Sequence, residues 1–175
     1  MKRTLILLTL LVFTSAVMAQ KGVSGALSAK DQGKLDKAYE VIEAVVNSTN
    51  PKDAKTINAP RTWEVRGEIF QAISQSKDAK VKKLSADPLS EALKSYKKAL
   101  SLDSKGRNAN SIKIKLTLME NDLMNQAVEA FNNEDYAKAL LSFEQILEMK
   151  QLPVMTKDNP NSIDTVIIFN AGLAA

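Results

Sequence analysis

Pairs of acidic residues are the first side chains in this sequence that could take part in catalysis. Glu40 and Glu43 form one pair at helical spacing, and Glu64 and Glu68 form another. General acid–base catalysis needs two carboxyl groups held across a cleft with separated pKa values. Nothing in the sequence indicates such a cleft around either pair, so we predict no catalytic residue among them.

Other catalytic chemistries are restricted by the residue types that the chain lacks. It contains no cysteine and no histidine, which excludes disulfides, thiolate metal sites, a cysteine nucleophile and every imidazole-based mechanism. It also has no glycine-rich phosphate loop, no nucleophile elbow and no metal-ligand spacing. Carboxylate, lysine and serine chemistry stays formally open. The sequence nevertheless predicts a protein that is not an enzyme and has no catalytic residues, metal or cofactor.

The composition is that of a soluble globular domain with a helical bias. Of the 175 residues, 45% are hydrophobic, 25% are charged and only 5% are aromatic, while glycine and proline are few. Alanine, leucine, lysine and glutamate are plentiful, and these residues favour helices. The 24 Lys and Arg against 20 Asp and Glu leave a small, dispersed positive charge. Nucleic-acid binding requires a clustered basic face, so no nucleic-acid partner is predicted.

Residues 1–19 have the three parts of a secretory signal peptide. Two basic residues precede an apolar run that reaches Val17, and Val17 and Ala19 are small residues at the positions that a signal peptidase reads. An uncleaved anchor is the alternative, but the run is shorter than the ~20 residues of a membrane span. We therefore predict cleavage after Ala19 and an exported, periplasmic protein whose mature domain, residues 20–175, does not span a membrane.

After the signal, apolar residues follow the 3.6-residue period of the α-helix and show hardly any strand pattern. We expect about seven helices separated by polar turns. The main ones cover residues 33–46, 60 to about 74, 88 to about 103, 110–132 and 136–149, with one before them and one after residue 162. Asp87, and either Ser162 or Asp164, are expected to cap helix starts. The charged segment 75–86 is predicted to be a loop or a weak helix. Each helix has one apolar stripe, so successive hairpins should stack.

Three of the predicted hairpins share a pattern of small and large residues. In each second helix an alanine is followed four residues later by a large residue: Ala38 and Ile42, Ala92 and Tyr96, Ala139 and Phe143. The first helices carry a small residue at a comparable place: Ala26, Gly67 and Ala127, with Gly172 beginning a fourth. Small residues let two helix backbones approach closely, while the large residue fills the gap between hairpins.

These residues give the chain its resemblance to a known repeat. Trp63-x2-Arg66-Gly67-x2-Phe70 and Glu134-Asp135-Tyr136-x2-Ala139-x3-Phe143 are similar to the two halves of the tetratricopeptide repeat, W-x2-L-G-x2-Y and A-x3-F. The resemblance implies an all-α, right-handed solenoid of stacked helical hairpins. Its units would cover about residues 22–51, 58–106 and 109–152, with a fourth beginning near 162. Arg66 stands where leucine is usual, Glu134 where glycine is usual, and the units are more widely spaced than in the family.

The resemblance also implies a function. Members of this family are non-catalytic interaction modules, and their first helices line a concave groove that holds a peptide or protein partner. The groove positions here would be Arg61, Glu64, Glu68, Gln71, Asn121, Met124, Val128 and Asn132. The alternative for each is a solvated position on an exposed helix face. A second hypothesis is a structural subunit of an envelope assembly that contacts its partners by its edges rather than by the groove.

Three further features have a simple interpretation beside a functional one. Lys77, Lys80, Lys82 and Lys83 could make weak contact with a lipid surface, although we favour a solubilising loop. Trp63 could stack on a ligand, but its helical spacing to Gly67 and Phe70 favours a core position. The helix after residue 162 has no second helix within the 175 residues, so we expect further sequence or another chain to cover it.

Overall fold

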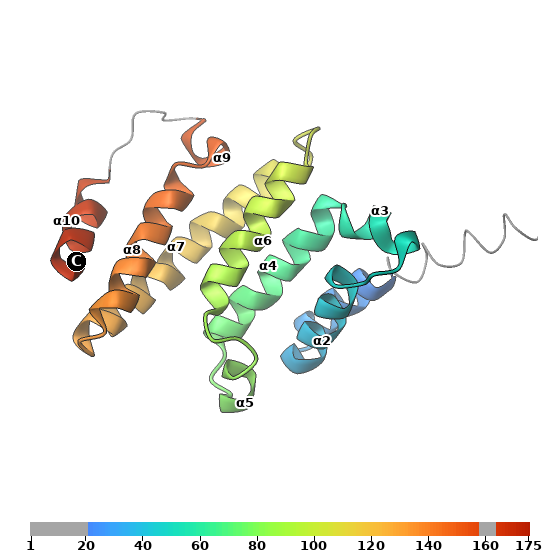
Figure 1. Ribbon diagram of the computed structural model, residues 1–175, viewed down its shortest axis with the longest axis horizontal. Coiled ribbons are helices and arrows are strands. Elements are labelled where there is room, and N and C mark those ends of the chain that lie inside the picture. Colours follow the sequence, from blue (N-terminus) through green and yellow to red (C-terminus); the bar gives the residue numbers. More distant parts are fainter. Residues whose placement is uncertain (1–20, 158–163) are drawn as a thin grey trace, which may run out of the picture.

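The computed structural model describes residues 21–157 and 164–175, and in these residues the protein is all-helical. The predicted signal peptide and Ser162 lie outside the described residues. Figure 1 shows the long helices side by side in a row, from residues 21–31 to the end of the chain. They are α2 (Leu35–Val46), α4 (Pro60–Gln75), α6 (Pro88–Leu102), α7 (Ala109–Asn132), α8 (Tyr136–Lys150) and α10 (Thr165–Ala174).

Short helices occupy the segments that connect the long ones. They are η1 (Pro51–Asp53), α3 (Ala54–Ile57), α5 (Ala79–Lys82) and α9 (Pro153–Thr156). The described residues therefore contain about ten helices instead of about seven, because segments that the sequence predicted as turns or a loop include single helical turns. The long helices that the sequence predicted are all present.

The helix starts follow from local sequence. The side chains of Asp87, Asp135 and Asp164 each accept a hydrogen bond from a backbone N–H in the first turn of α6, α8 and α10. The predicted caps at Asp87 and Asp164 are thus confirmed. The 3.6-residue period predicted a helix that begins at Gly33, and this start is wrong because α2 begins at Leu35. Gly33 has φ +74°, a backbone conformation that suits glycine, and it lies in the turn before α2.

Neighbouring helices pack in hairpin-like pairs, α4 with α6 and α7 with α8, and further contacts join α2 to α4 and α8 to α10. Two hydrophobic clusters result, with α4 between them. One cluster contains residues of the first helices together with Val65 and Ile69 of α4. The other begins at Phe70 and continues through α6, α7 and α8 to Ile167 of α10. The expected stacking of successive helices is therefore present.

The repeated pattern of small and large residues has a direct structural counterpart in the pair α4 and α6. Tyr96 is completely buried, and its ring lies against the backbone of Gly67. A Cβ atom placed on Gly67 would lie 2.5 Å from the nearest ring carbon, far inside normal contact distance. Glycine at this position is what allows the tyrosine ring to reach the backbone of α4.

Trp63 also has a structural role in the core. Its ring is partly buried against the larger cluster, and its Nε1 donates a hydrogen bond of 2.7 Å to the carbonyl oxygen of Ile57.

No helix in residues 21–157 and 164–175 is both long enough and apolar enough to cross a membrane.

Candidate protein-binding surface

The first half of the predicted groove, on α4, contains a carboxylate that is almost completely buried. Glu64 is only 1% exposed. Its Oε1 accepts hydrogen bonds from Ser111 (2.6 Å) and Lys115 (2.5 Å), and its Oε2 accepts one from Asn108 (3.0 Å) and lies 2.9 Å from Arg61. Because three of these partners belong to α7 or the residue before it, Glu64 joins α4 to α7.

Glu68 and Gln71 continue the same contact along α4. Glu68 forms ion pairs with Lys30 (2.9 Å), Arg61 (3.2 Å) and Lys115 (3.4 Å). Gln71 donates a hydrogen bond of 2.7 Å to Asp122 and accepts one of 3.0 Å from the hydroxyl of Tyr96. The polar atoms of these predicted groove residues are thus bound by neighbours in the same chain, and only Arg61 is exposed at the edge.

The buried position of Glu64 predicts a specific dependence of stability on pH. Burial alone would raise the pKa of Glu64, but hydrogen bonds from Lys115, Ser111, Arg61 and Asn108 outweigh it and lower the pKa to about 2. The pKa in the folded state is below the usual value of 4.5, so the stabilisation is complete above that value and is lost as the pH falls towards 2.

Urea unfolding of the wild type and of Glu64→Gln over this pH range tests the prediction. The wild type should lose more stability than the variant as the pH falls, so the difference between them should shrink. Other acidic groups with lowered pKa values, such as Asp164, are the same in both proteins. A difference that stays constant from neutral to acidic pH would contradict the assigned role of Glu64.

The second half of the predicted groove, on α7, is different because it is exposed and uncharged. Along one side of this helix, successive exposed residues are four, three, four, three and four positions apart, which keeps them on one helical face. We call this set the α7 stripe: Ile114, Leu118, Asn121, Asn125, Val128 and Asn132. Ile114 is 63% and Leu118 58% exposed, so the stripe begins with large apolar side chains open to solvent.

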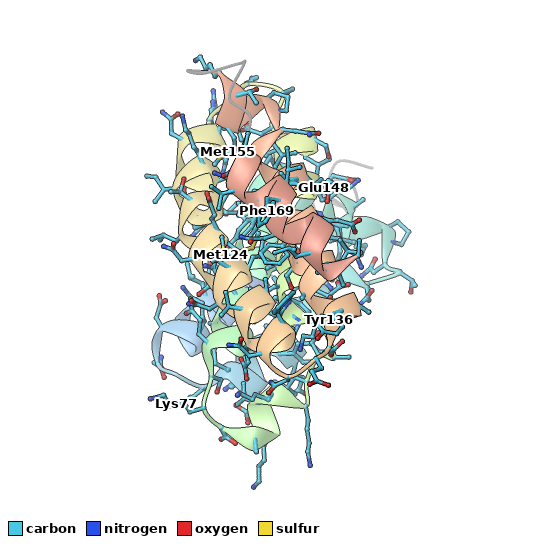
Figure 2. The ribbon with its side chains drawn as sticks, turned by 90° about the vertical axis from the view of Figure 1, so that its left-hand side faces the viewer. Lys77, Met124, Tyr136, Glu148, Met155 and Phe169 are labelled. Carbon is cyan, nitrogen blue, oxygen red and sulfur yellow. The ribbon has the colours of Figure 1, made fainter. Side chains whose placement is uncertain are left out.

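Three of the predicted groove residues, Asn121, Val128 and Asn132, belong to this stripe. Met124 lies beside it, half-buried, and packs against the larger hydrophobic cluster. Figure 2 shows Met124 on α7, on the side of the molecule where α10 is in front. The structure therefore separates the predicted groove into a set bound within the chain on α4 and a solvent-facing set on α7.

A small apolar pocket lies at the C-terminal end of the stripe. Its volume is about 140 Å³, and helices α7, α8 and α10 contribute its walls. The lining residues are Val128, Phe131, Asn132, Phe143, Asn170 and Leu173. The pocket therefore combines aromatic and aliphatic walls with the amide groups of Asn132 and Asn170.

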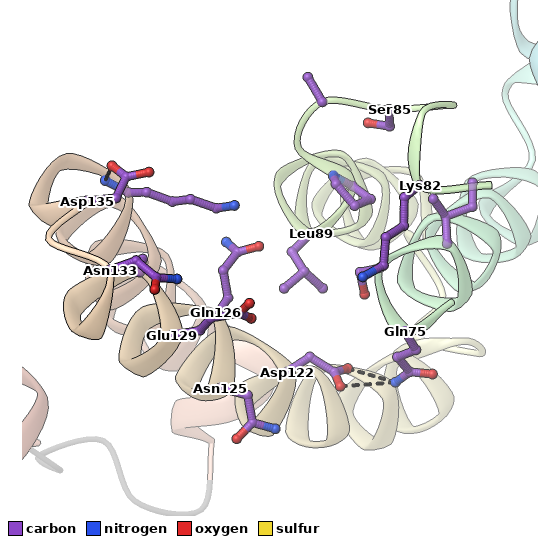
Figure 3. Close-up of a pocket in the computed structure, with 16 residues that line it drawn as sticks. Gln75, Lys82, Ser85, Leu89, Asp122, Asn125, Gln126, Glu129, Asn133 and Asp135 are labelled. Atoms are coloured by element: carbon purple, nitrogen blue, oxygen red, sulfur yellow. Dashed lines mark hydrogen bonds between the residues drawn. The ribbon is translucent and has the colours of Figure 1, made fainter. Parts of the chain in front are cut away.

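A larger polar groove of about 560 Å³ lies on the other side of α7, between the end of α4, the segment around α5 and the turn before α8. Figure 3 shows Asp122 accepting hydrogen bonds from Gln75 on one side, and Glu129, Asn133 and Asp135 on the other. Asn125 of the stripe also lines this groove. The exposed face of α7 therefore lies between a polar groove and an apolar pocket.

The basic cluster lies around α5, at the lower edge of the row of helices in Figure 1. Lys77, Lys80, Lys82 and Lys83 are all exposed on or beside α5, and Figure 2 shows Lys77 near the bottom of the view. Lys82 alone of these four lines the polar groove.

In residues 21–157 and 164–175, no group of three or more acidic side chains is arranged to hold a metal ion.

Ile114, Leu118 and Asn125 are stripe residues that sequence reasoning missed. The apolar positions of this helix were assigned to a single buried face that includes Ile112 and Leu116. The missed signal was a second series of residues that begins at Ile114, two positions after Ile112 of the buried series, and also repeats every three or four residues. An apolar side chain in that second series cannot share the buried face and must lie elsewhere on the helix.

Comparisons with protein-family models, with curated proteins and with solved structures found no match to this chain. What the structure confirms is an all-helical protein with hairpin-like helix contacts. Membership of the tetratricopeptide family remains a prediction from the sequence motifs.

Proposed function

We propose that this protein is a non-catalytic interaction module that binds a segment of another protein along the α7 stripe. The observation that carries the proposal is the row of exposed, uncharged residues on α7, in a chain of which 25% of residues are charged. Protein interfaces are depleted of charged residues at their centre and enriched in apolar ones. The stripe combines three apolar side chains, Ile114, Leu118 and Val128, with the amide groups of three asparagines, Asn121, Asn125 and Asn132.

The chemistry of the stripe favours a partner with both apolar side chains and accessible backbone. Complete burial of one leucine or isoleucine side chain contributes about 1.5–3 kcal/mol, so Ile114 and Leu118 can anchor one end of a bound segment. Asn121 and Asn125 can donate to and accept from its backbone. At the other end, the pocket beside Val128 accommodates one further apolar side chain.

The α4 residues contribute to this function indirectly. Glu64 and Glu68 hold Lys115 of α7, and Gln71 holds Asp122. These contacts fix the position of α7 relative to α4, and a surface fixed before binding loses less entropy when the partner arrives. We therefore assign Glu64, Glu68 and Gln71 to positioning the stripe and not to contacting the partner.

A single substitution with a matched control tests the proposal. Leu118→Lys places a charge in the stripe, whereas Leu141→Lys makes the same change at an exposed leucine on α8. Both residues are more than one-third exposed, and lysine is a good helix former, so both variants should fold. In co-purification from cells that contain the partner, Leu118→Lys should reduce recovery at least about tenfold, equivalent to about 1.4 kcal/mol, and Leu141→Lys should not. Equal recovery of the partner with the two variants would rule out the α7 stripe as its binding site.

The repeat architecture and the export of the protein are parts of the same proposal. The repeated sequence pattern of small and large residues, together with the packing of Tyr96 on Gly67, supports a tetratricopeptide-like repeat. The features of residues 1–19 support export to the periplasm. N-terminal sequencing of the exported protein is expected to give Gln20 as its first residue. A chain that keeps Met1 in the cytoplasm would contradict the export proposal without affecting the binding proposal.

A further inference from the structure

The α7 stripe has a different charge on each of its two sides. On one side, Asp122 is three positions before Asn125 of the stripe, and Glu129 is four positions after it. Residues at this spacing are neighbours on a helix surface, so both carboxylates lie directly beside the stripe. Figure 3 shows Asp122, Asn125 and Glu129 along the same stretch of α7, at the polar groove.

The opposite side of the stripe carries no charge at the corresponding positions. These positions are Thr117, Met124 and Phe131, each three or four residues from Asn121 or Val128 of the stripe. The small pocket of about 140 Å³, which Phe131 lines, is also surrounded by uncharged residues. The stripe is therefore bordered by negative charge on one side only.

The two carboxylates are not neutralised by neighbouring cations. Asp122 accepts hydrogen bonds from the side-chain amides of Gln71 (2.7 Å) and Gln75 (3.0 Å), which are uncharged donors. Glu129 is exposed and forms no hydrogen bond or ion pair with another described residue. Because a carboxylate can accept about four hydrogen bonds, Asp122 has capacity for a further donor as well.

The cations nearest to this side of the stripe do not cancel its charge. Lys115 is the one basic residue of α7 at the same spacing from the stripe, and Glu64 and Glu68 balance it. Lys82 and Lys138 also line the polar groove. They lie on α5 and α8, and within the described residues neither forms an ion pair with the carboxylates of α7. The charges directly beside the stripe are therefore negative.

We propose that the segment bound along the α7 stripe is basic on one side, with one lysine or arginine paired with Asp122 and another with Glu129. This inference rests on the proposed function, since it names the chemistry of the same partner. Hydrogen bonds between a carboxylate and a charged donor are stronger than neutral ones. Complementary charges across an interface also fix its register and disfavour other partners, so the carboxylates select for a basic segment.

The geometry of α7 sets the length and the charge spacing of the segment. Ile114 and Asn132 are the ends of the stripe, about 27 Å apart along the helix. About eight residues of extended chain, at about 3.3 Å each, span this length, and an extended backbone is open to the asparagines of the stripe. Asp122 and Glu129 are two helical turns apart, about 10 Å. The two basic residues of the segment are therefore expected about two to four positions apart.

Selection from a library of random twelve-residue peptides displayed on phage tests the inference, with the full chain as bait. Peptides bound at the stripe are identified by loss of binding to Leu118→Asn, which removes an apolar anchor without adding a charge. These peptides should contain at least about twice as many lysines and arginines as the unselected library. The chain itself has more basic than acidic residues, 24 against 20, so its net charge disfavours such peptides and the preference must arise locally.

Variants of the full chain locate the preference. Asp122→Asn combined with Glu129→Gln removes both charges and should weaken binding of the selected peptides about fivefold, the sum of two moderate ion pairs. Glu129→Gln alone leaves the hydrogen bonds of Asp122 intact and should weaken binding about twofold. The matched control combines Glu40→Gln with Glu144→Gln, which removes two exposed charges on α2 and α8 and should have no effect.

The possible failures separate this inference from the proposed function. Peptides that depend on Leu118 but have no excess of basic residues would overturn the inference and leave the stripe as a binding site. Equal weakening by the stripe variants and by the control pair would also overturn it, because the charge effect would then not be local. If no recovered peptide depends on Leu118, the proposed function itself is contradicted, and the inference is overturned with it.

Discussion

Replacing Arg66 with alanine is expected to lower the free energy of unfolding by about 2–4 kcal/mol, because it removes a buried guanidinium and leaves the half-buried carboxylates of Glu43 and Glu91 without this partner. Arg66 lies on α4 and joins three helices. Its Nε donates to Glu43 of α2 (2.7 Å), its Nη2 to Glu91 of α6 (2.9 Å) and its Nη1 to Ser95 (2.7 Å). Its guanidinium also lies 4.3 Å from the centre of the Phe70 ring, a favourable cation–π distance.

Urea unfolding monitored by circular dichroism measures this effect, with Arg107→Ala as the control. Arg107 is exposed in the turn before α7, so its replacement should change stability by less than about 0.5 kcal/mol. Arg66→Lys should also be destabilising, because an ammonium group cannot reproduce the geometry in which one planar guanidinium binds several partners. A loss below about 1 kcal/mol for Arg66→Ala would show that the three-helix contact contributes little.

The second large effect is expected where Tyr96 packs on Gly67. Tyr96→Ala should lower the free energy of unfolding by about 3–5 kcal/mol, since it leaves a cavity in the core. It also removes the hydroxyl that donates to Gln71. Gly67→Ala should cost about 1–3 kcal/mol, because the new Cβ overlaps the ring and forces the helices apart.

The double variant distinguishes this packing from two independent effects. With Tyr96 already replaced by alanine, the Cβ of Gly67→Ala has room. The double variant should therefore lose less stability than the sum of the losses in the two single variants. Gly172→Ala is the matched control. It makes the same change in open space and should be neutral or stabilising by up to about 1 kcal/mol. Additive losses would contradict the close approach of ring and backbone.

The helices were predictable from the sequence because they depend on local features. The 3.6-residue period and the capping residues Asp87 and Asp164 act within a few positions of themselves. The contacts of Glu64 were not predictable in this way. Its partners Asn108 and Lys115 are 44 and 51 positions away, so their meeting depends on how α4 and α7 pack, which a periodic pattern does not define.

Arg66 shows the same limit from another direction. The sequence showed that Arg66 stands where the repeat that the chain resembles usually has leucine, but it indicated no role for this arginine. It did not reveal the two carboxylates that neutralise the charge, Glu43 and Glu91, because they lie on two different neighbouring helices. On α7, the exposed series through Leu118 was hidden by the stronger apolar series of the core beside it.

Site-specific photo-cross-linking tests the central claim, that the α7 stripe contacts a protein partner, most directly. The chain contains no cysteine, so Asn121→Cys and Glu144→Cys each provide one attachment point for a benzophenone label. Both positions are exposed, the first in the stripe and the second on α8. A partner adduct is expected from position 121 and none from position 144. An adduct from position 144 alone would contradict binding along the α7 stripe.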